Sequence, residues 1–401
     1  DFSIPTNDKP IVPEGKSVAL DLNGHSITAE NSTEQYAFYN LGDLTLYDSN
    51  ATTTYSVIST AGSINARGIY NGRTPDGEII PTAKITVLNG VYNALGTNGG
   101  AAIFNYGTVN IKSGTFTSVG GYSLNNQSSG TMFIETATVN GGIYNVGDLV
   151  INDGDIATTR GDYTHAVYHA GTNLVINGGM FTGNGNEVIH ANDKPATING
   201  GTFKKVEKTS YLIAGSKLVI NDGIFFAHES NPAGHPVRPD VTIKGGTFNY
   251  VPTNVAEGYK AVTVNGSTMI IPDAYNATNY SGLYNDSENN YYVYSAEGFL
   301  GLNELFANNS KIASVNIMAD IDMDGATWNA VKVHQDWDAI LTMFDGNNHT
   351  ISNMNINGQA LFTTFTVRGD AVIKDIIFDN VSTTYSSANA AIVVSNLYSN
   401  I

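Results

Sequence analysis

The chain has 401 residues, with 42 glycines, 11 prolines, no cysteine and a formal net charge of −17 at pH 7. The acidic balance excludes a nucleic-acid-binding surface, and the lack of cysteine excludes disulfides, thiolate metal sites and cysteine nucleophiles. No run approaches the about 18 to 20 apolar residues of a membrane span. A composition rich in Gly, Asn, Thr, Ser and Tyr favours many short strands joined by tight turns.

A repeat runs along the first two thirds of the chain. Its unit is a short apolar strand, a turn with glycine, and a further apolar or aromatic residue, and the aligned glycines are Gly90, Gly114, Gly154, Gly179, Gly201, Gly223 and Gly246. The spacing is 22 to 25 residues except for one interval of 40, which hides a degenerate rung through residues 131–134. A second column with the same period precedes these turns, in segments 38–42, 103–107, 143–147 and 167–171. Two columns with one period predict a solenoid.

Each unit can bury its apolar face only by stacking on its neighbours. Val109 and Ile111 alternate with polar residues, so one face of that strand turns inward. The glycine allows a positive φ, and the aromatics that follow are expected in one layer: Phe116, Phe181, Phe203 and Phe248. One turn is expected to hold an amide ladder of Asn40, Asn105, Asn125 and Asn145. The predicted fold is all-β, a right-handed parallel β-helix whose hand follows the rule for parallel crossovers. Neither propeller nor leucine-rich-repeat motifs are seen.

The period lapses after about residue 252. Residues 258–264 and 268–271 predict a hairpin that covers the end of the stack. Ser295 is the expected N-cap of one helix that stops at Asn308, with Glu297 in its first turn and an apolar face. Strand patterns resume at 315–318 and continue to 378. We therefore expect a first β-helix with its hairpin over 1–272, a linker or surface hairpin over 273–294, and a capping helix with the start of a second, truncated β-helix over 295–401.

Several longer strings resemble a known class of proteins. The run PEGKSVALDLNGHSIT, the INGGTF and IKGGTF turns and the string AEGYKAVTV resemble right-handed parallel β-helix surface proteins of gut Bacteroidetes and Firmicutes. Residues 295–381, from SAEGFLGLNELF to AVIKDIIFDNV, resemble the GLUG-associated β-helix type of large secreted or cell-wall proteins. Similar coils occur in phage fibres and tailspikes. The resemblance implies external display and carries no catalytic residue with it.

Polysaccharide cleavage is the enzyme activity to weigh for such a fold. The chain lacks a Gly-His-Gly string, and the only echo of a lyase base is Arg238 before Pro239 and Asp240, which also reads as a proline-bounded strand start. Asp153 and Asp155 flank a turn glycine, and Asp222 recurs in the column of Asp153. Paired acids can divide acid and base roles, but Asp before Gly is also ordinary turn chemistry. We predict no catalytic residue.

Candidate binding residues lie on the later rungs. His169 and His190 are expected at equivalent positions of successive rungs, near His165 and Tyr163. They either bind a metal or a sugar, or replace Asn in the turn ladder. Lys204 and Lys205 belong to the basic cluster, which fits an acidic glycan or a solvated loop.

The last third of the chain adds two candidates. Asp320, Asp322 and Asp324 match the first half of a calcium loop, but the twelfth position is Val331 instead of Glu, so no metal is assigned. Trp328 is expected in the core, and Trp337 as an exposed platform for stacking.

These features are interpreted as a non-enzymatic β-solenoid, secreted or on the cell surface, that serves attachment (as an adhesin) or structural display, with carbohydrate binding along one flank. Cell-surface or host glycans are the expected partners, no cofactor is expected, and homo-oligomerisation stays open. Two alternatives also stay open: a virion fibre or tailspike component of a phage, and a polysaccharide lyase or glycoside hydrolase.

Overall fold

The structure is a computed structural model, and it describes residues 1–5, 8, 10–30, 35–50, 57–61, 66–96, 100–158, 165–184, 186–206, 211–228, 237–264, 266–308, 311–333, 341–367, 371–385 and 391–399. The chain divides into two compact units. The first comprises Asp1–Ala261 with Ser267–Ile270, and the second comprises Val262–Gly266 with Ile271–Ile401.

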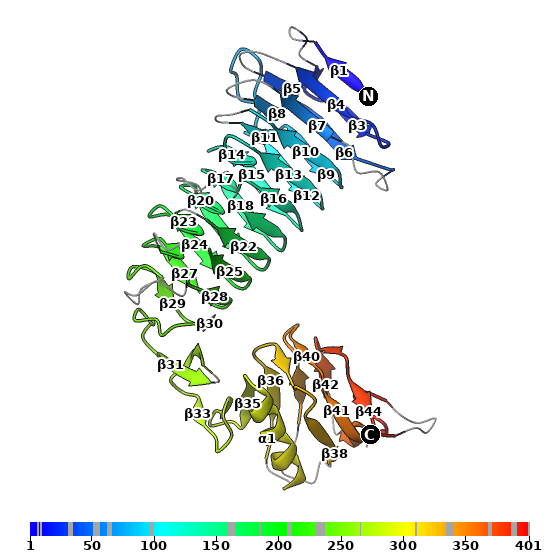
Figure 1. The fold of residues 1–401 in the computed structure, drawn as a ribbon, viewed down its shortest axis with the longest axis vertical. Coiled ribbons are helices and arrows are strands. Elements are labelled where there is room, and N and C mark those ends of the chain that lie inside the picture. Colours follow the sequence, from blue (N-terminus) through cyan, green and yellow to red (C-terminus); the bar gives the residue numbers. More distant parts are fainter. Residues whose placement is uncertain are drawn as a thin grey trace. The chain divides into compact units, whose positions relative to one another are not determined.

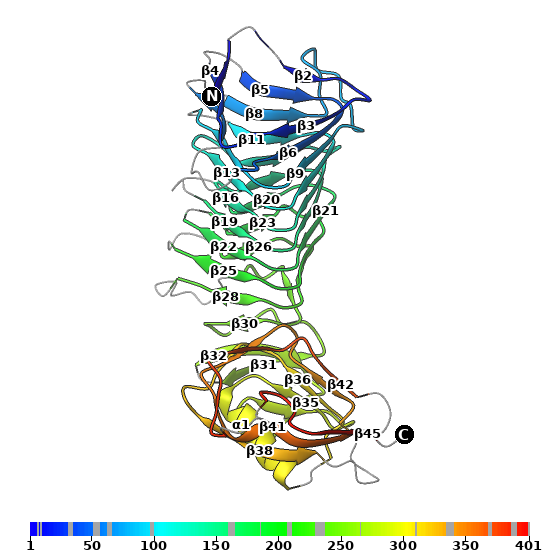
Figure 2. The same ribbon diagram turned by 90° about the vertical axis from the view of Figure 1, so that its right-hand side faces the viewer.

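The first unit is a stack of coils in which each coil contributes a strand to up to three sheets (Figures 1 and 2). One sheet has ten strands: β3 (Ser17–Asp21), β6 (Asp43–Tyr47), β9 (Lys84–Val87), β12 (Thr108–Ile111), β15 (Thr131–Ile134), β18 (Asp148–Ile151), β21 (Asn173–Ile176), β24 (Ala196–Ile198), β27 (Leu218–Ile220) and β29 (Thr242–Ile243).

A second sheet has nine strands: β2 (Ile11–Val12), β5 (Gln35–Asn40), β8 (Ala66–Asn71), β11 (Ala101–Asn105), β14 (Leu124–Asn126), β17 (Ile143–Asn145), β20 (Val167–His169), β23 (Ile189–Ala191) and β26 (Ile213–Ala214). The third sheet has thirteen strands: β1 (Phe2–Ile4), β4 (Ile27–Glu30), β7 (Val57–Ala61), β10 (Val91–Ala94), β13 (Thr115–Ser118), β16 (Thr138–Asn140), β19 (Asp155–Ala157), β22 (Met180–Gly183), β25 (Thr202–Lys205), β28 (Ile224–Phe226), β30 (Thr247–Phe248), β32 (Ser267–Pro272) and β31 (Tyr259–Val264).

Successive coils pair in parallel and place like side chains over like. In the thirteen-stranded sheet, one inward column runs through Tyr92, Phe116, Val139, Ile156, Phe181, Phe203, Phe225 and Phe248. The last four rings stack with centroids 4.7–5.0 Å apart. These rings are completely buried in one continuous core. The predicted all-β parallel β-helix and its aromatic layer are therefore confirmed.

The degenerate rung and the turn glycines are also confirmed. Strand β15 fills the interval of 40 residues and pairs with β12 and β18. All seven aligned glycines have a positive φ. At Gly201, where φ is 104°, a Cβ would lie 2.9 Å from the carbonyl oxygen of Gly179, the equivalent residue one coil earlier. Glycine is needed there because both the dihedral angle and the neighbouring coil exclude a side chain.

The end of the first stack is bordered by the expected hairpin strands. Strand β32 pairs antiparallel with β30, and β31 is its other neighbour in the sheet. The antiparallel strand ends the parallel ladder at β30, so that edge is paired instead of open.

The second unit is a smaller β-solenoid. Its six-stranded sheet contains β33 (Asn276–Ala277), β34 (Leu283–Asn285), β35 (Asn290–Val293), β36 (Ser314–Ile317), β39 (Met343–Asp345) and β42 (Val372–Lys374). A three-stranded sheet contains β37 (Ile321–Asp322), β40 (Thr350–Ser352) and β43 (Ile377–Asp379), and a four-stranded sheet contains β38 (Thr327–Val333), β41 (Asn355–Val367), β44 (Ser382–Thr383) and β45 (Leu397–Ser399).

Helix α1 (Ala296–Ala307) lies between β35 and β36 in the chain and packs on β38. Ser295 is its N-cap, because the Ser295 hydroxyl accepts a hydrogen bond from the Gly298 amide, and the helix ends at Asn308. The Phe299 ring lies 4.7 Å from that of Trp328, which is completely buried and donates to the Leu361 carbonyl. The predicted helix, its cap and the core position of Trp328 are confirmed.

Neighbouring phenylalanines of β28 offer a test of the stacked core. Phe225→Ala removes a ring that is completely buried between Phe203 and Phe248, and we expect it to lower the free energy of unfolding by about 3–5 kcal/mol. Phe226→Ala is the control, because Phe226 faces outward with 42% exposure, and we expect a change within about 0.5 kcal/mol. Urea unfolding of both variants measures the difference, and similar losses would contradict the register.

Candidate functional site

A ladder of carboxamides lies inside the nine-stranded sheet. Its completely buried members are Asn40, Asn71, Asn105, Asn126 and Asn145, one from each of β5, β8, β11, β14 and β17. Nδ2 of each of the first four donates to Oδ1 of the next asparagine at 2.7 Å, and these Nδ2 atoms also donate to nearby backbone carbonyls. The ladder therefore satisfies polar backbone groups that the stack has removed from water.

The predicted ladder was wrong at one residue and incomplete at another. Asn125 pairs in register with Phe104 and Tyr144 on the outward side of the sheet, whereas Asn126 points inward. In a strand, a shift by one residue moves the side chain to the opposite face. Asn71 was missed, although the Ile-Tyr-Asn run at 69–71 repeats at 143–145 and could have revealed it.

His169 ends this ladder. It is completely buried, its Nδ1 lies 2.8 Å from Nδ2 of Asn145, and its Nε2 lies 3.0 Å from the Pro195 carbonyl oxygen. Because Asn145 donates, Nδ1 must accept and Nε2 must carry the proton, which fixes a neutral tautomer. Burial lowers the pKa of His169, against the effect of the bond to Pro195. The ladder interpretation of His169 is confirmed, and this residue is closed to an external ligand.

His190 does not occupy the position equivalent to His169, contrary to the prediction. His169 pairs in register with Ala191, and His190 pairs with Tyr168. The two histidines therefore lie on opposite faces of the sheet, since adjacent side chains of a strand alternate. The sequence held the signal for this offset, because His169 lies ten residues before Gly179 whereas His190 lies eleven before Gly201.

An outward file of rings follows the same sheet. Tyr144 stacks on Tyr168 with centroids 5.2 Å apart, and Tyr168 stacks on His190 at 5.3 Å, with interplanar angles of 5° and 2°. Tyr122 lies 5.5 Å from Tyr144 at a tilt. All four side chains are half-buried. Their ring faces contact one another, so the file presents mainly ring edges and polar tips to the outside.

Nearer the start of the chain, the same outward column continues as Tyr39, Tyr70 and Phe104. The guanidinium of Arg67 lies 4.3 Å from the Phe104 ring centroid and contacts the Tyr36 hydroxyl. Cation–π contact of this kind stabilises a partly desolvated arginine. This cluster was not predicted, although an aromatic residue directly precedes Asn40, Asn71 and Asn105 in the sequence.

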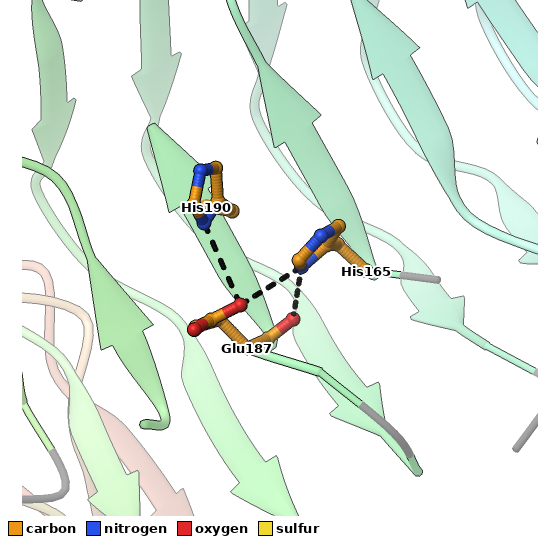
Figure 3. Close-up of side chains that lie close together, drawn as sticks. All are labelled: His165, Glu187 and His190. Carbon is orange, nitrogen blue, oxygen red and sulfur yellow. Dashed lines mark hydrogen bonds and ion pairs between the residues drawn. The ribbon is translucent and has the colours of Figure 1, made fainter. Parts of the chain in front are cut away.

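His165, Glu187 and His190 come together beside this file (Figure 3). Val167 pairs with Ile189, and His165 and Glu187 each precede their paired residue by two positions. The Nδ1 atoms of both histidines lie 3.5 Å from the same Glu187 oxygen, Oε2, while Nδ1 of His165 lies 2.9 Å from the Glu187 carbonyl oxygen. The side chains of His165, Glu187 and His190 are 7%, 17% and 23% exposed.

The electrostatics of this cluster favour an ionised carboxylate beside a neutral imidazole. Burial lowers the pKa of His165, against the effects of its bond to the Glu187 carbonyl and of the Glu187 charge. Burial alone would raise the pKa of Glu187, but the nearby imidazoles of His190 and His165 and a backbone hydrogen bond lower it. Glu187 was missed in the sequence, where its place three residues before His190 was the available signal.

The remaining candidate binding residues do not join this cluster as a group. Lys204 is exposed on β25, whereas Lys205 is buried and contacts the carbonyl oxygen of Asn186. Tyr163 and Trp337 lie outside the described residues.

The acids weighed for catalysis make local turn contacts. Oδ1 of Asp153 accepts from the Gly154 amide at 2.8 Å, and Oδ1 of Asp222 accepts from the Gly223 amide at 2.7 Å. Arg238 forms a 3.2 Å ion pair with Asp240. The turn role expected for Asp before Gly is therefore observed at both positions.

The calcium-like segment uses its carboxylates within the second unit. Asp322 accepts from the Asp324 amide and from Asn353, and Asp320 accepts from the Thr350 amide. Among the described residues, His165, Glu187 and His190 are the only group of three or more His, Cys, Asp or Glu with ligand atoms close enough to hold one ion.

Within the part of the chain that the structure covers, no helix has the length and apolar character needed to cross a membrane. Comparison of the chain with protein-family models, curated proteins and solved structures gave no match. The class is therefore defined by the fold: this is a parallel β-helix repeat protein.

The buried ladder histidine generates a pH prediction. A histidine in the unfolded chain titrates near pH 6.5, and the pKa of His169 in the folded protein is lower. Between these two pKa values the unfolded state therefore binds more protons than the folded state does. We expect the free energy of unfolding to fall as the pH decreases from about 7.5 through about 6.5 towards the folded pKa.

His169→Asn should continue the carboxamide ladder and remove this titration, which makes the pH dependence of stability shallower. His165, whose pKa is also lowered, retains part of the slope. Urea unfolding between about pH 8 and pH 5.5 compares the two proteins. An unchanged slope in the variant would argue against a neutral, buried His169.

Proposed function

We propose that this chain is a non-enzymatic β-solenoid, displayed outside the cell, that serves attachment or structural display and contacts glycans along the outer face of the nine-stranded sheet. The observation that carries the proposal is the uninterrupted stack, in which recurring polar side chains make hydrogen bonds between coils. The carboxamide ladder and the exposed chain from Asn152 through Asn177 and Asn199 to Asn221 are examples. Such residues maintain a scaffold instead of binding a small substrate.

Support for external display comes from the sequence strings that resemble β-helix surface proteins of gut Bacteroidetes and Firmicutes. The composition is compatible with it, because a stack without cysteine needs no particular redox environment. Strong net negative charge also keeps long, repetitive β-structures from associating nonspecifically.

Support for glycan contact comes from the outward file of Tyr144, Tyr168 and His190. These half-buried residues expose apolar ring edges together with polar hydroxyl and imidazole atoms, repeated at each coil. Sugars also combine apolar CH groups with hydroxyls, so a glycan chain could contact such a surface along its length. Because the ring faces stack on one another, we propose contact along the edges of the file. Lys204 lies on a different sheet, so it is not part of this surface.

Binding of the full chain to an array of neutral and acidic glycans tests the proposal. We expect Tyr144→Ala combined with Tyr168→Ala to weaken binding to any glycan retained by the wild type by about tenfold or more, since the double variant removes both the ring edges and the hydroxyls of the proposed contact surface. Phe226→Ser, which changes an exposed ring on another sheet, is the matched control and should leave binding unchanged. Equal binding by all three proteins, with folding verified by circular dichroism, would exclude this surface.

The same glycans test the non-enzymatic part of the proposal. We expect no new reducing or unsaturated ends after prolonged incubation. Turnover that disappears in Asp153→Asn or Arg238→Ala would instead establish a polysaccharide-cleaving enzyme.

A further inference from the structure

We propose that His165, Glu187 and His190 form a binding site for a divalent transition-metal ion, with Zn²⁺ as the preferred class. The site shares His190 with the outward file proposed to contact glycans, but the test of metal binding does not depend on glycan binding. Imidazole nitrogens and a carboxylate oxygen are ordinary zinc ligands, and three protein ligands leave a fourth position for water or for a donor atom of another molecule.

The distances between the candidate ligand atoms suit one ion. In a tetrahedral site with bonds of about 2.0–2.1 Å, neighbouring ligand atoms lie about 3.4 Å apart. Both histidine Nδ1 atoms are 3.5 Å from Oε2 of Glu187, and one ligand atom from each of the three residues lies within 4.8 Å of the others. Only a small closure of the histidines is needed to surround an ion.

An unpartnered nitrogen provides a second observation. Nδ1 of His190 is buried and makes no hydrogen bond, although it faces the carboxylate of Glu187. Most buried polar atoms have a hydrogen-bond partner, so an orphaned imidazole nitrogen beside an acceptor-only group calls for an explanation. A cation between the nitrogen and the carboxylate would satisfy both, because each has a lone pair to donate.

The stack holds these groups in place before any ion arrives. His190 is fixed by its parallel stacking on Tyr168, and His165 and Glu187 come from adjacent coils joined by the pairing of Val167 with Ile189. Metal binding would replace the hydrogen bond from His165 Nδ1 to the Glu187 carbonyl, with the imidazole proton moving to Nε2.

The charges around the cluster are mixed. Lys205 contacts the carbonyl oxygen of Asn186, next to Glu187, and its positive charge opposes protonation of His165. The same charge disfavours a cation, so the affinity of the site depends on the Glu187 carboxylate. A neutral His165 and an ionised Glu187 are the protonation states that a metal ion requires.

Calorimetric titration of Zn²⁺ into the full chain, freed of chelator and of any histidine tag, tests the proposal. We expect one ion per chain, with Glu187→Gln and His190→Asn each weakening binding at least about tenfold. His349→Ala is the matched control, because His349 also faces a carboxylate, Asp320 at 3.3 Å, but without a third ligand, and it should bind as the wild type does.

Co²⁺ gives a second readout that does not depend on affinity alone. We expect a ligand-field spectrum of a tetrahedral ion with nitrogen and oxygen ligands in the wild type and in His349→Ala, and its loss in Glu187→Gln and His190→Asn. Circular dichroism verifies that each variant is folded, and two separate substitutions guard against one that is not. Absence of stoichiometric binding, or binding that persists in both site variants, would overturn the proposal.

Discussion

The structure depends on parallel pairing of each strand with the equivalent strand one coil away. This pairing carries every side chain along a column at the strand spacing of about 4.8 Å, so a residue is surrounded mainly by its own equivalents. Apolar columns become a continuous core, as from Tyr92 to Phe248, while amide columns become ladders. A polar residue can be buried in this fold because its equivalents in the adjacent coils supply its hydrogen-bond partners.

The same constraint creates the groups of residues on the outer surface. His165 and Glu187 are far apart in sequence for a local motif, yet the pairing of Val167 with Ile189 brings them together. Tyr144, Tyr168 and His190 form a file for the same reason. A side-chain cluster on a solenoid therefore requires no special loop, only compatible residues at the same column of adjacent coils.

Much of the fold could be predicted because its signals are periodic. The glycine column, the aromatic layer around Phe203 and the Ser295 cap each follow from local rules that the rest of the structure does not override. The errors arose where coils differ in length. The coil that holds Asn125 and Asn126 has no aligned glycine from which to count, so the sequence did not show which of the two faces inward. His190 lies one residue further from its glycine than His169 does, and this offset of one residue places it on the opposite face. Glu187 was missed because only the pairing of Val167 with Ile189 shows that Glu187 and His165 occupy equivalent positions, each two residues before its strand partner.

The carboxamide ladder has a direction. From Asn40 to Asn145, every Nδ2 donates to the side chain of the next coil towards the C-terminus, and His169 accepts the last of these bonds. The residue that follows His169 in the column is Ala191, whose side chain cannot form a hydrogen bond. A duplicated coil that carries asparagine in this column would fit anywhere before His169 with all amides still paired. Beyond His169 the inserted amide would find no side-chain acceptor at Ala191, so the ladder accommodates added coils on its N-terminal side only.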